Sequence, residues 1–207
     1  MLDAADHRLL VTILAAGASR RLGQPKQLVD LRDEPLLRRQ CRMALAAKIG
    51  GVAVILGYRS TECAATIADL PVAHQINAQW EEGLASSIRE AVRAALAADA
   101  TGLGLLHVDQ YRLEAADLRA VHAAWSNSGG LNACVSTHAG ASGPPVIFPK
   151  RCFDDLMLLE GDSGARGVLS RLPTADLCSI SVPNAFHDLD LPAELAGLLK
   201  SSRSSAT

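Results

Sequence analysis

Wholly apolar segments alternate along the chain with segments whose apolar residues recur every three or four positions. The first pattern predicts buried strands and the second predicts amphipathic helices. The predicted strands are 9–14, 52–56, 72–77, 102–108, 134–137, 145–148 and 178–182. The predicted helices are 35–48, about 60–68, 86–98, 115–126, 151–159, 163–172 and 192–200. Repeated strand–helix units of this kind indicate an α/β fold, with a mainly parallel sheet covered on both faces.

Local start and stop signals refine the helix limits. Pro35 suits a first-turn position, and Gly50-Gly51 should end the same helix. Ser60 is expected to cap the second helix, and Ser86 or Ser87 the third. We expect one domain over 1–200, followed by a small polar tail, 201–207, that should be mobile.

Composition narrows the class of protein. Of 207 residues, 49% are hydrophobic and 20% charged, as in an ordinary globular protein. The formal net charge of −2 argues against a nucleic-acid partner, which would need a basic surface. The five scattered cysteines include no C-x-x-C pair, so we expect reduced thiols in the cytoplasm. Asp3 and Asp6 precede the first apolar run, whereas a signal peptide has positively charged residues there. No apolar stretch is long enough to span a membrane.

The residues after the first predicted strand read AAGASRRLGQPK, from Ala15 to Lys26. Backbone N–H groups in a small-residue loop at a sheet edge can bind phosphate oxygens, and Arg21 and Lys26 add positive charge. This chemistry suits a polyphosphate. The loop matches neither G-x-x-x-x-G-K-[ST] nor G-x-G-x-x-G, because Ser19 and Leu22 stand where those motifs need glycine.

Asp109 directly follows the predicted strand 102–108. An exposed carboxylate at that edge is either a turn residue or a ligand for Mg²⁺, which takes one or two carboxylates together with water and phosphate oxygens. Strand alternation puts His107 on the same face, where we expect packing or a local hydrogen bond. Trp80 is expected to anchor the core.

The order G-x-S-x-R-x-G-x-P-K, from Gly17 to Lys26, resembles the signature loop of the nucleotidyltransferases. The segment from Leu14 to Leu28, LAAGASRRLGQPKQL, is most similar to the molybdenum cofactor cytidylyltransferases, in the MobA-like NTP transferase family. Further segments resemble that family: N-x-x-W-x-x-G-x-x-x-S at 77–87, Asp-Gln at 109–110, G-x-P-V-x-F at 143–148, G-D-x-G-A-R at 161–166 and D-L-D-L-P at 188–192. Two positions depart from the family pattern, because Tyr111 replaces a proline and Leu191 replaces a threonine.

The resemblance implies a Rossmann-like three-layer sandwich and transfer of CMP from CTP to the phosphate of molybdenum-loaded molybdopterin, with release of pyrophosphate. A molybdoenzyme that receives the product is a further implied partner. The implied nucleotide-binding residues are Ala15, Ala16, Gly17, Ala18, Ser19, Arg21, Lys26, Gly83 and Ser86. The implied catalytic residues are Arg21, Lys26 and Asp109, and the implied Mg²⁺ ligands are Asp109 and Asp190, supported by Asp188. Arg166 is expected either to pair with Asp162 or to bind the acceptor phosphate.

Alternatives stay open at this point. Cytosine is preferred over guanine because guanylyl relatives read Leu-Ala-Gly-Gly and Asp-Lys where this loop reads Leu-Ala-Ala-Gly and Pro-Lys. The donor could instead be GTP or ATP, and the acceptor another phosphorylated molecule such as a sugar phosphate. A non-catalytic cofactor-binding protein on the same scaffold is a third reading, motivated by Tyr111 and Leu191.

Overall fold

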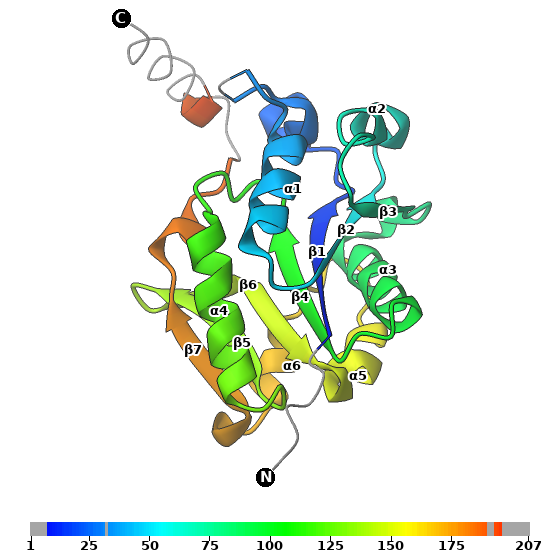
Figure 1. Cartoon of the computed structure of the whole chain (residues 1–207). Coiled ribbons are helices and arrows are strands. Elements are labelled where there is room, and N and C mark those ends of the chain that lie inside the picture. Colours follow the sequence, from blue (N-terminus) through cyan, green and yellow to red (C-terminus); the bar gives the residue numbers. More distant parts are fainter. Residues whose placement is uncertain (1–7, 32, 190–192, 196–207) are drawn as a thin grey trace, which may run out of the picture.

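A seven-stranded sheet forms the middle layer of the molecule (Figure 1). The computed structural model describes residues 8–31, 33–189 and 193–195. The strand order is β3-β2-β1-β4-β6-β5-β7, and β6 alone runs antiparallel to its neighbours. The strands are β1 (Leu9–Ala15), β2 (Gly51–Leu56), β3 (Ala73–Ile76), β4 (Gly102–His107), β5 (Ala133–His138), β6 (Ala141–Pro149) and β7 (Leu177–Ser181).

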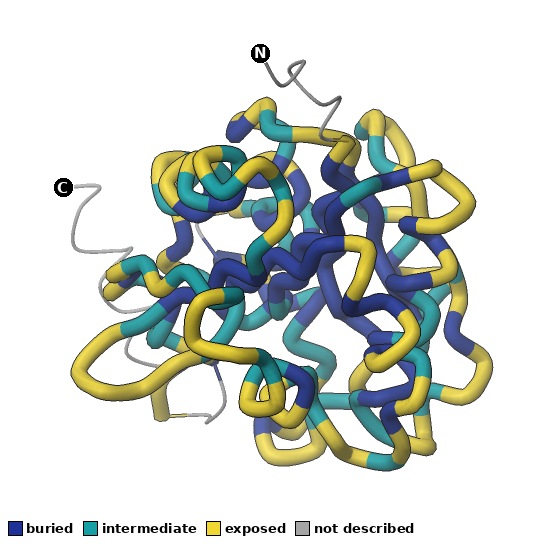
Figure 2. The backbone as a smooth tube through the Cα atoms, turned by 90° about the horizontal axis from the view of Figure 1, so that it is seen from below, coloured by how far each residue is buried: buried dark blue, intermediate teal, exposed yellow. Residues whose placement is uncertain are grey.

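Helices cover both faces of the sheet (Figure 1). One face carries α1 (Leu36–Ala47), α2 (Ser60–Ala65) and α4 (Ala115–Asn127), whose buried side chains share one apolar cluster. The other carries α3 (Leu84–Ala97), α5 (Phe153–Met157) and α6 (Arg166–Arg171), which share a second cluster. Successive residues of β1 enter opposite clusters, Ile13 the first and Leu14 the second. Figure 2 shows the buried strands enclosed by exposed loops. The predicted Rossmann-like α/β sandwich is confirmed.

The strand order places β1 next to β4, although β2 and β3 lie between them in the sequence. Leu14 of β1 is in register with His107 of β4, so both strands end at the same edge. From β1 the chain continues through α1 to β2, toward one edge of the sheet, whereas from β4 it continues through α4 to β5, toward the other edge. Such a switch point opens a crevice beyond the strand ends, which is where open α/β sheets bind their ligands.

All seven predicted strands are present, but several predicted helix limits are wrong. The segment 151–159 divides into a 3-10 turn (Lys150–Cys152) and the short α5. The segment 163–172 is helical only from Arg166. The predicted helix 192–200 falls mostly outside the described residues, and the predicted tail 201–207 falls wholly outside them.

The predicted cap residues were also wrong. α2 begins after Arg59 (φ 50°) and α3 begins after Gly83, two residues before Ser86. α1 ends at Lys48 in a left-handed conformation, before the glycine pair. Gly50 has a different reason to be glycine, because a Cβ there would lie 2.1 Å from the carbonyl oxygen of Leu9. Close packing against β1, rather than helix termination, requires it.

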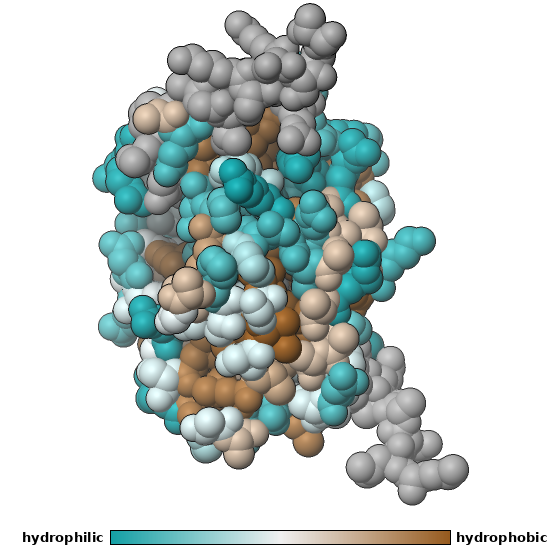
Figure 3. All heavy atoms as spheres, turned by 90° about the vertical axis from the view of Figure 1, so that its left-hand side faces the viewer, coloured by the Kyte–Doolittle hydropathy of each residue, from teal (hydrophilic) through white to brown (hydrophobic). Residues whose placement is uncertain are grey.

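The face shown in Figure 3 carries hydrophilic residues over its upper half and flanks, with hydrophobic residues mainly lower down. The large apolar side chains exposed on the described surface come from different elements: Tyr58, Ile76, Leu96, Leu131 and Leu158. Apolar residues scattered in this way are normal for a protein surface. No helix in the described part of the chain is long and apolar enough to cross a bilayer.

Candidate active site

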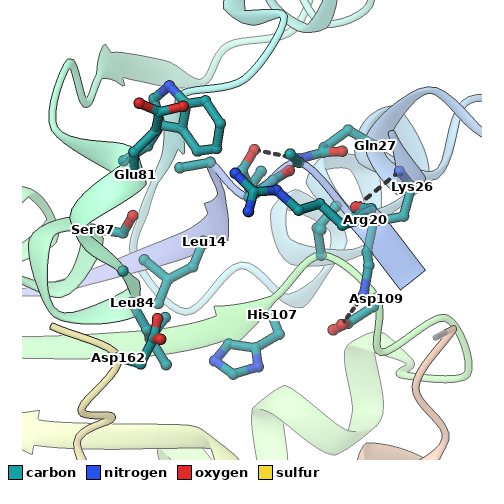
Figure 4. A pocket seen from close by; sticks show the side chains of 18 residues that line it. Leu14, Arg20, Lys26, Gln27, Glu81, Leu84, Ser87, His107, Asp109 and Asp162 are labelled. Carbon is teal, nitrogen blue, oxygen red and sulfur yellow. Dashed lines mark hydrogen bonds and ion pairs between the residues drawn. The ribbon is translucent and has the colours of Figure 1, made fainter. Parts of the chain in front are cut away.

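A pocket of about 410 Å³ occupies the crevice beyond β1 and β4 (Figure 4). One wall is the loop that follows β1, and the floor is the end of β4. The opposite wall comes from the 3-10 turn Trp80–Glu82, the start of α3 and Asp162. The predicted residues that line it are Ala15, Ala16, Gly17, Ala18, Ser19, Lys26, Gly83 and Asp109. Residues up to 148 positions apart in the sequence, Leu14 and Asp162, therefore meet at one site.

The loop is shaped by a buried side chain that the sequence analysis did not single out. Gln27 is 1% exposed, and its Nε2 donates to the carbonyl oxygens of Ala15 (2.7 Å) and Gly17 (2.8 Å). Ser19 adopts a left-handed conformation (φ 54°), and its Oγ accepts a hydrogen bond from the Lys26 N–H. These contacts close the loop on itself and fix where its backbone faces the pocket.

The two neighbouring arginines of the loop are placed differently. Both are exposed, but Arg20 lines the pocket, whereas Arg21, the predicted ligand, is not among the lining residues (Figure 4). Both belong to the 3-10 turn Arg20–Leu22, in which three successive residues point in three directions. Because Leu22 is buried, it fixes the directions in which the Arg20 and Arg21 side chains leave this turn. The structure thus brings Arg20, rather than Arg21, to the predicted phosphate site.

Lys26 and Asp109 form an ion pair across the pocket floor, with 2.6 Å between Nζ and Oδ2. Their side chains are 13% and 16% exposed, so solvent screens the pair only in part. The other carboxylate oxygen, Asp109 Oδ1, is buried and has no hydrogen-bond partner. A buried carboxylate oxygen without a donor is a position suited to a cation.

The turn that carries Asp109 is held from several sides. Gln110 is 2% exposed; its Oε1 accepts from the His107 N–H, and its Nε2 donates to the carbonyls of Pro144 and Ala185 at 2.7 Å each. The Tyr111 N–H donates to the Asp109 carbonyl at 2.7 Å. Proline, which the resemblance implies at this position, could not make this bond. The tyrosine departure therefore leaves Asp109 at the pocket.

The segment of the second predicted acidic site lies beside Asp109. The Leu189 N–H donates to the Asp109 carbonyl at 3.1 Å, and Asp188 forms an isolated bridge with Gln110. The Asp188 side chain is exposed. Asp190, the other predicted metal ligand, lies outside the described residues.

Asp109 fits a magnesium ion, judged by its unpartnered Oδ1. Over residues 8–31, 33–189 and 193–195, no three His, Cys, Asp or Glu side chains gather as a metal cluster. Mg²⁺ does not require protein side chains for all of its ligands, because substrate phosphates and water supply most of them in nucleotide enzymes. One carboxylate at the phosphate loop is consistent with that pattern.

The far wall depends on Gly83. Its φ is 124°, and a Cβ there would lie 2.5 Å from both Asp162 Oδ1 and the Gly161 carbonyl oxygen. The Ala85 N–H donates to that same carbonyl, at 3.0 Å. The absence of a side chain at Gly83 therefore lets the segment 161–162 close against the start of α3, which brings Asp162 into the pocket wall.

Ser86 is not among the residues that line the pocket. Its hydroxyl donates to the Gly83 carbonyl (2.8 Å) and accepts from Asn77 Nδ2 (2.8 Å), so it supports the wall from inside. Ser87, one residue later, lines the pocket instead. Because α3 begins at Leu84, neither serine caps it as predicted.

Trp80 is half-buried and lines the pocket, which corrects its predicted place in the core. Its ring packs at 59° on Tyr58, with 5.6 Å between centroids. Gly57 permits this approach, since a Cβ there would lie 2.7 Å from the Trp80 Cβ. The pocket therefore has an aromatic edge as well as a polar floor.

The chain belongs to the family of the MobA-like NTP transferase domain, whose model matches residues 11–176. Fold and family together define a nucleotidyltransferase. The chain is 29% identical over 197 residues to the purine catabolism protein PucB of Bacillus subtilis, covering 90% of this chain and 93% of PucB.

Two solved structures illustrate the similarity. Rv0371c of Mycobacterium tuberculosis, in a complex with manganese, is 26% identical with a TM-score of 0.73, covering 94% of this chain and 99% of that one. A nucleotidyl transferase from Methanothermobacter thermautotroptrophicus has a TM-score of 0.78 at 17% identity, covering 96% and 99%, and shows the shared fold.

Proposed function

We propose that this protein transfers CMP from CTP to the phosphate of molybdenum-loaded molybdopterin and releases pyrophosphate. The observation that supports this most directly is the Lys26–Asp109 pair beneath the loop after β1. It places one fixed cation and one carboxylate where a triphosphate would lie against backbone N–H groups. The loop has Leu-Ala-Ala-Gly at 14–17 and Pro-Lys at 25–26, as in the cytidylyl members of the family, and this resemblance supports CTP as the nucleotide.

In the proposed reaction an oxygen of the acceptor phosphate attacks the α-phosphorus of the nucleotide. The bond from the α-phosphorus to the bridging oxygen of the β-phosphate breaks, and its electrons leave with pyrophosphate. The acceptor phosphate is already ionised at neutral pH, so no general base is needed. The protein contributes alignment and neutralisation of charge.

Each side chain of the floor has a part in that alignment. The backbone of 15–19 and the Arg20 guanidinium would hold the β- and γ-phosphates, because both line the same wall. The Lys26 ammonium would neutralise charge on the leaving group. Asp109 Oδ1 would hold a divalent cation, with Asp190 as the other proposed ligand. Bound Mg²⁺ supplies neutralisation of the triphosphate and of the departing pyrophosphate.

The test is pyrophosphate release with Mg²⁺ and each of CTP, GTP and ATP, with and without molybdenum-loaded molybdopterin. Release with CTP only when the pterin is present supports the proposal, and EDTA should abolish that release. Release with GTP or ATP would overturn the cytidylyl assignment. Release with a sugar phosphate and not with the pterin would overturn the acceptor. Nucleotide binding without release under any condition would indicate a non-catalytic binding protein.

A further inference from the structure

The carboxylate that fits a divalent cation already holds a cation of the protein's own. Lys26 Nζ lies 2.6 Å from Asp109 Oδ2, while Asp109 Oδ1 is buried without a hydrogen-bond partner. Because both oxygens belong to one carboxylate, a cation on Oδ1 would be a near neighbour of the Lys26 ammonium. Like charges repel strongly where water screens them only in part. Lys26 and a divalent cation therefore compete for Asp109.

The Lys26 side chain is the part of this pair that can move. The Lys26 backbone N–H donates to Ser19 Oγ at 3.2 Å, and the residue opens the 3-10 turn Lys26–Leu28, so its main chain is held. Asp109 is short and lies on the turn that the buried Gln110 side chain holds. The flexible four-carbon stem of lysine can instead carry its ammonium to another anion in the same pocket.

The loop after β1 is where such an anion would bind. The backbone of 15–19 lines the same pocket as Lys26 and Asp109. A triphosphate held by that backbone would bring several negative charges within reach of the ammonium. Lysine binds phosphate as a point charge, and a triphosphate offers more charge than one carboxylate. When Lys26 exchanges Asp109 for phosphate oxygens, both carboxylate oxygens become available.

The other carboxylates of the pocket are not shielded in this way. Glu81 and Asp162 lie on the far wall, across the pocket from Lys26 and Asp109 (Figure 4). Both are exposed, and neither has an ion-pair partner among the residues that the structure describes. Arg166, a possible partner for Asp162 by sequence, lines an adjoining, mainly apolar cavity of about 130 Å³ instead. Lys26 therefore shields Asp109 specifically.

We propose that Lys26 is an internal competitor that excludes divalent cations from Asp109 until a nucleotide binds. This inference rests on the proposed function, since the nucleotide supplies the phosphates that draw Lys26 away. An order of binding follows from it: the nucleotide, or its complex with the metal, binds before any separate metal ion. The ion pair thus keeps the nucleotide-free protein from holding a metal ion where the phosphates belong.

The experiment titrates Mn²⁺ into the full-length protein without nucleotide or acceptor and measures the Kd by calorimetry. Lys26→Met removes the competing charge at similar side-chain length, so its Kd for Mn²⁺ should be at least about tenfold lower than that of the wild type. Lys26→Arg keeps the charge, and its Kd should stay at or above the wild-type value. Lys150→Met is the matched control, because Lys150 is exposed and distant from the pocket; its Kd should not change.

A double variant identifies the residue that the ion binds. Adding Asp109→Asn to Lys26→Met should raise the Kd for Mn²⁺ back to the wild-type value or above. Mn²⁺ should also raise the Tm of Lys26→Met more than that of the wild type, because a ligand stabilises the folded state that binds it. This second readout shows that Lys26→Met is folded when it binds the ion.

The release of Asp109 has its own test. CTP titrated in the presence of EDTA should bind Lys26→Met at least about tenfold more weakly than the wild type, because the phosphates lose their ammonium partner. Equal affinities for this metal-free CTP would overturn the exchange of Asp109 for phosphate.

Three results of the Mn²⁺ titration would overturn the competition: equal affinity in Lys26→Met and wild type, equally tight binding by Lys26→Arg and Lys26→Met, or tight binding that survives Asp109→Asn. The last would place the ion on another carboxylate, such as Glu81 or Asp162. The titration contains no nucleotide, so it is separate from the pyrophosphate assay. Turnover without the tenfold difference would keep the transfer reaction and remove the competition. The difference without turnover would keep the competition and remove the reaction.

Discussion

Lys26 Nζ lies 2.6 Å from Asp109 Oδ2, which joins the loop after β1 to the turn after β4 across 83 positions of sequence. The pair links the proposed phosphate site to the proposed metal site. Each partner neutralises the other until a nucleotide arrives. The charge at the pocket floor therefore depends on this one contact.

Removing one partner of this pair should cost stability. Lys26→Met leaves the shielded Asp109 carboxylate without that counter-ion, and we expect the free energy of unfolding to fall by about 3 kcal/mol. Adding Asp109→Asn to Lys26→Met removes the charge and should recover much of that loss. Urea denaturation of both single variants and the double variant measures the coupling. A strictly additive double variant would contradict an energetic role for the pair.

The same residues should be required for turnover. We expect Lys26→Met and Asp109→Asn to lower kcat by about 10²-fold or more, through lost neutralisation of the transition state. Lys150→Met is the control, because Lys150 is exposed after β6, beside the amino end of β4 and far from the pocket. Near-normal pyrophosphate release by Asp109→Asn would remove Asp109 from the mechanism.

Gln27→Leu should collapse the phosphate loop. Two carbonyls, those of Ala15 and Gly17, would lose their side-chain donor, at a cost of about 2 kcal/mol in unfolding free energy. The affinity for nucleotide should fall as well, because the loop backbone would no longer be held. Gln24 is exposed in the same loop, so Gln24→Leu should change stability by less than about 0.5 kcal/mol. Calorimetric titration with CTP separates the two effects.

Gly83→Ala tests close packing of the far wall. At φ 124° and ψ −172°, Gly83 lies in a region that is essentially restricted to glycine, so alanine should cost about 1–3 kcal/mol there, and the overlap with Gly161 and Asp162 should add about 2 kcal/mol more. Gly129 also has a positive φ (67°), which alanine tolerates at about 1 kcal/mol, and nothing lies within 4 Å of its Cβ position, so Gly129→Ala should show a backbone cost alone. Equal denaturation midpoints for these two variants would show that the contact with 161–162 is unimportant.

The contact between α1 and the turn after α2 should weaken in acid. Arg38 holds the pKa of Asp69 at about 2, below its ordinary 3.8, chiefly through side-chain hydrogen bonds of 2.5 and 2.9 Å. Because the folded pKa is the lower one, this stabilisation is present above about pH 4 and is lost as the pH falls toward 2. Asp69→Asn should therefore be less stable than wild type at pH 7 and equal to it near pH 2. Thermal unfolding at both pH values measures the difference.

Local pattern was sufficient for the sheet and for most of the phosphate loop. β1 and β4 are apolar on both faces because helices cover both sides, and such strands can be recognised from a few consecutive residues. Helix starts were harder to predict. Ser60 and Ser86 have good capping chemistry, but Arg59 and Gly83 take the turn conformations that precede α2 and α3.

The sequence by itself determined the fold class, the family and the loop from Gly17 to Lys26, because these depend on residue types at short spacing. The tertiary structure decided which side chains face the pocket. It placed Arg20 there rather than Arg21, and Ser87 rather than Ser86. The reason is that buried residues, Leu22 in the loop and Asn77 beside Ser86, fix the direction in which each side chain points. It also separated Asp162 from Arg166 into two adjoining spaces. Only packing among distant segments decides such orientations, and no local spacing encodes them.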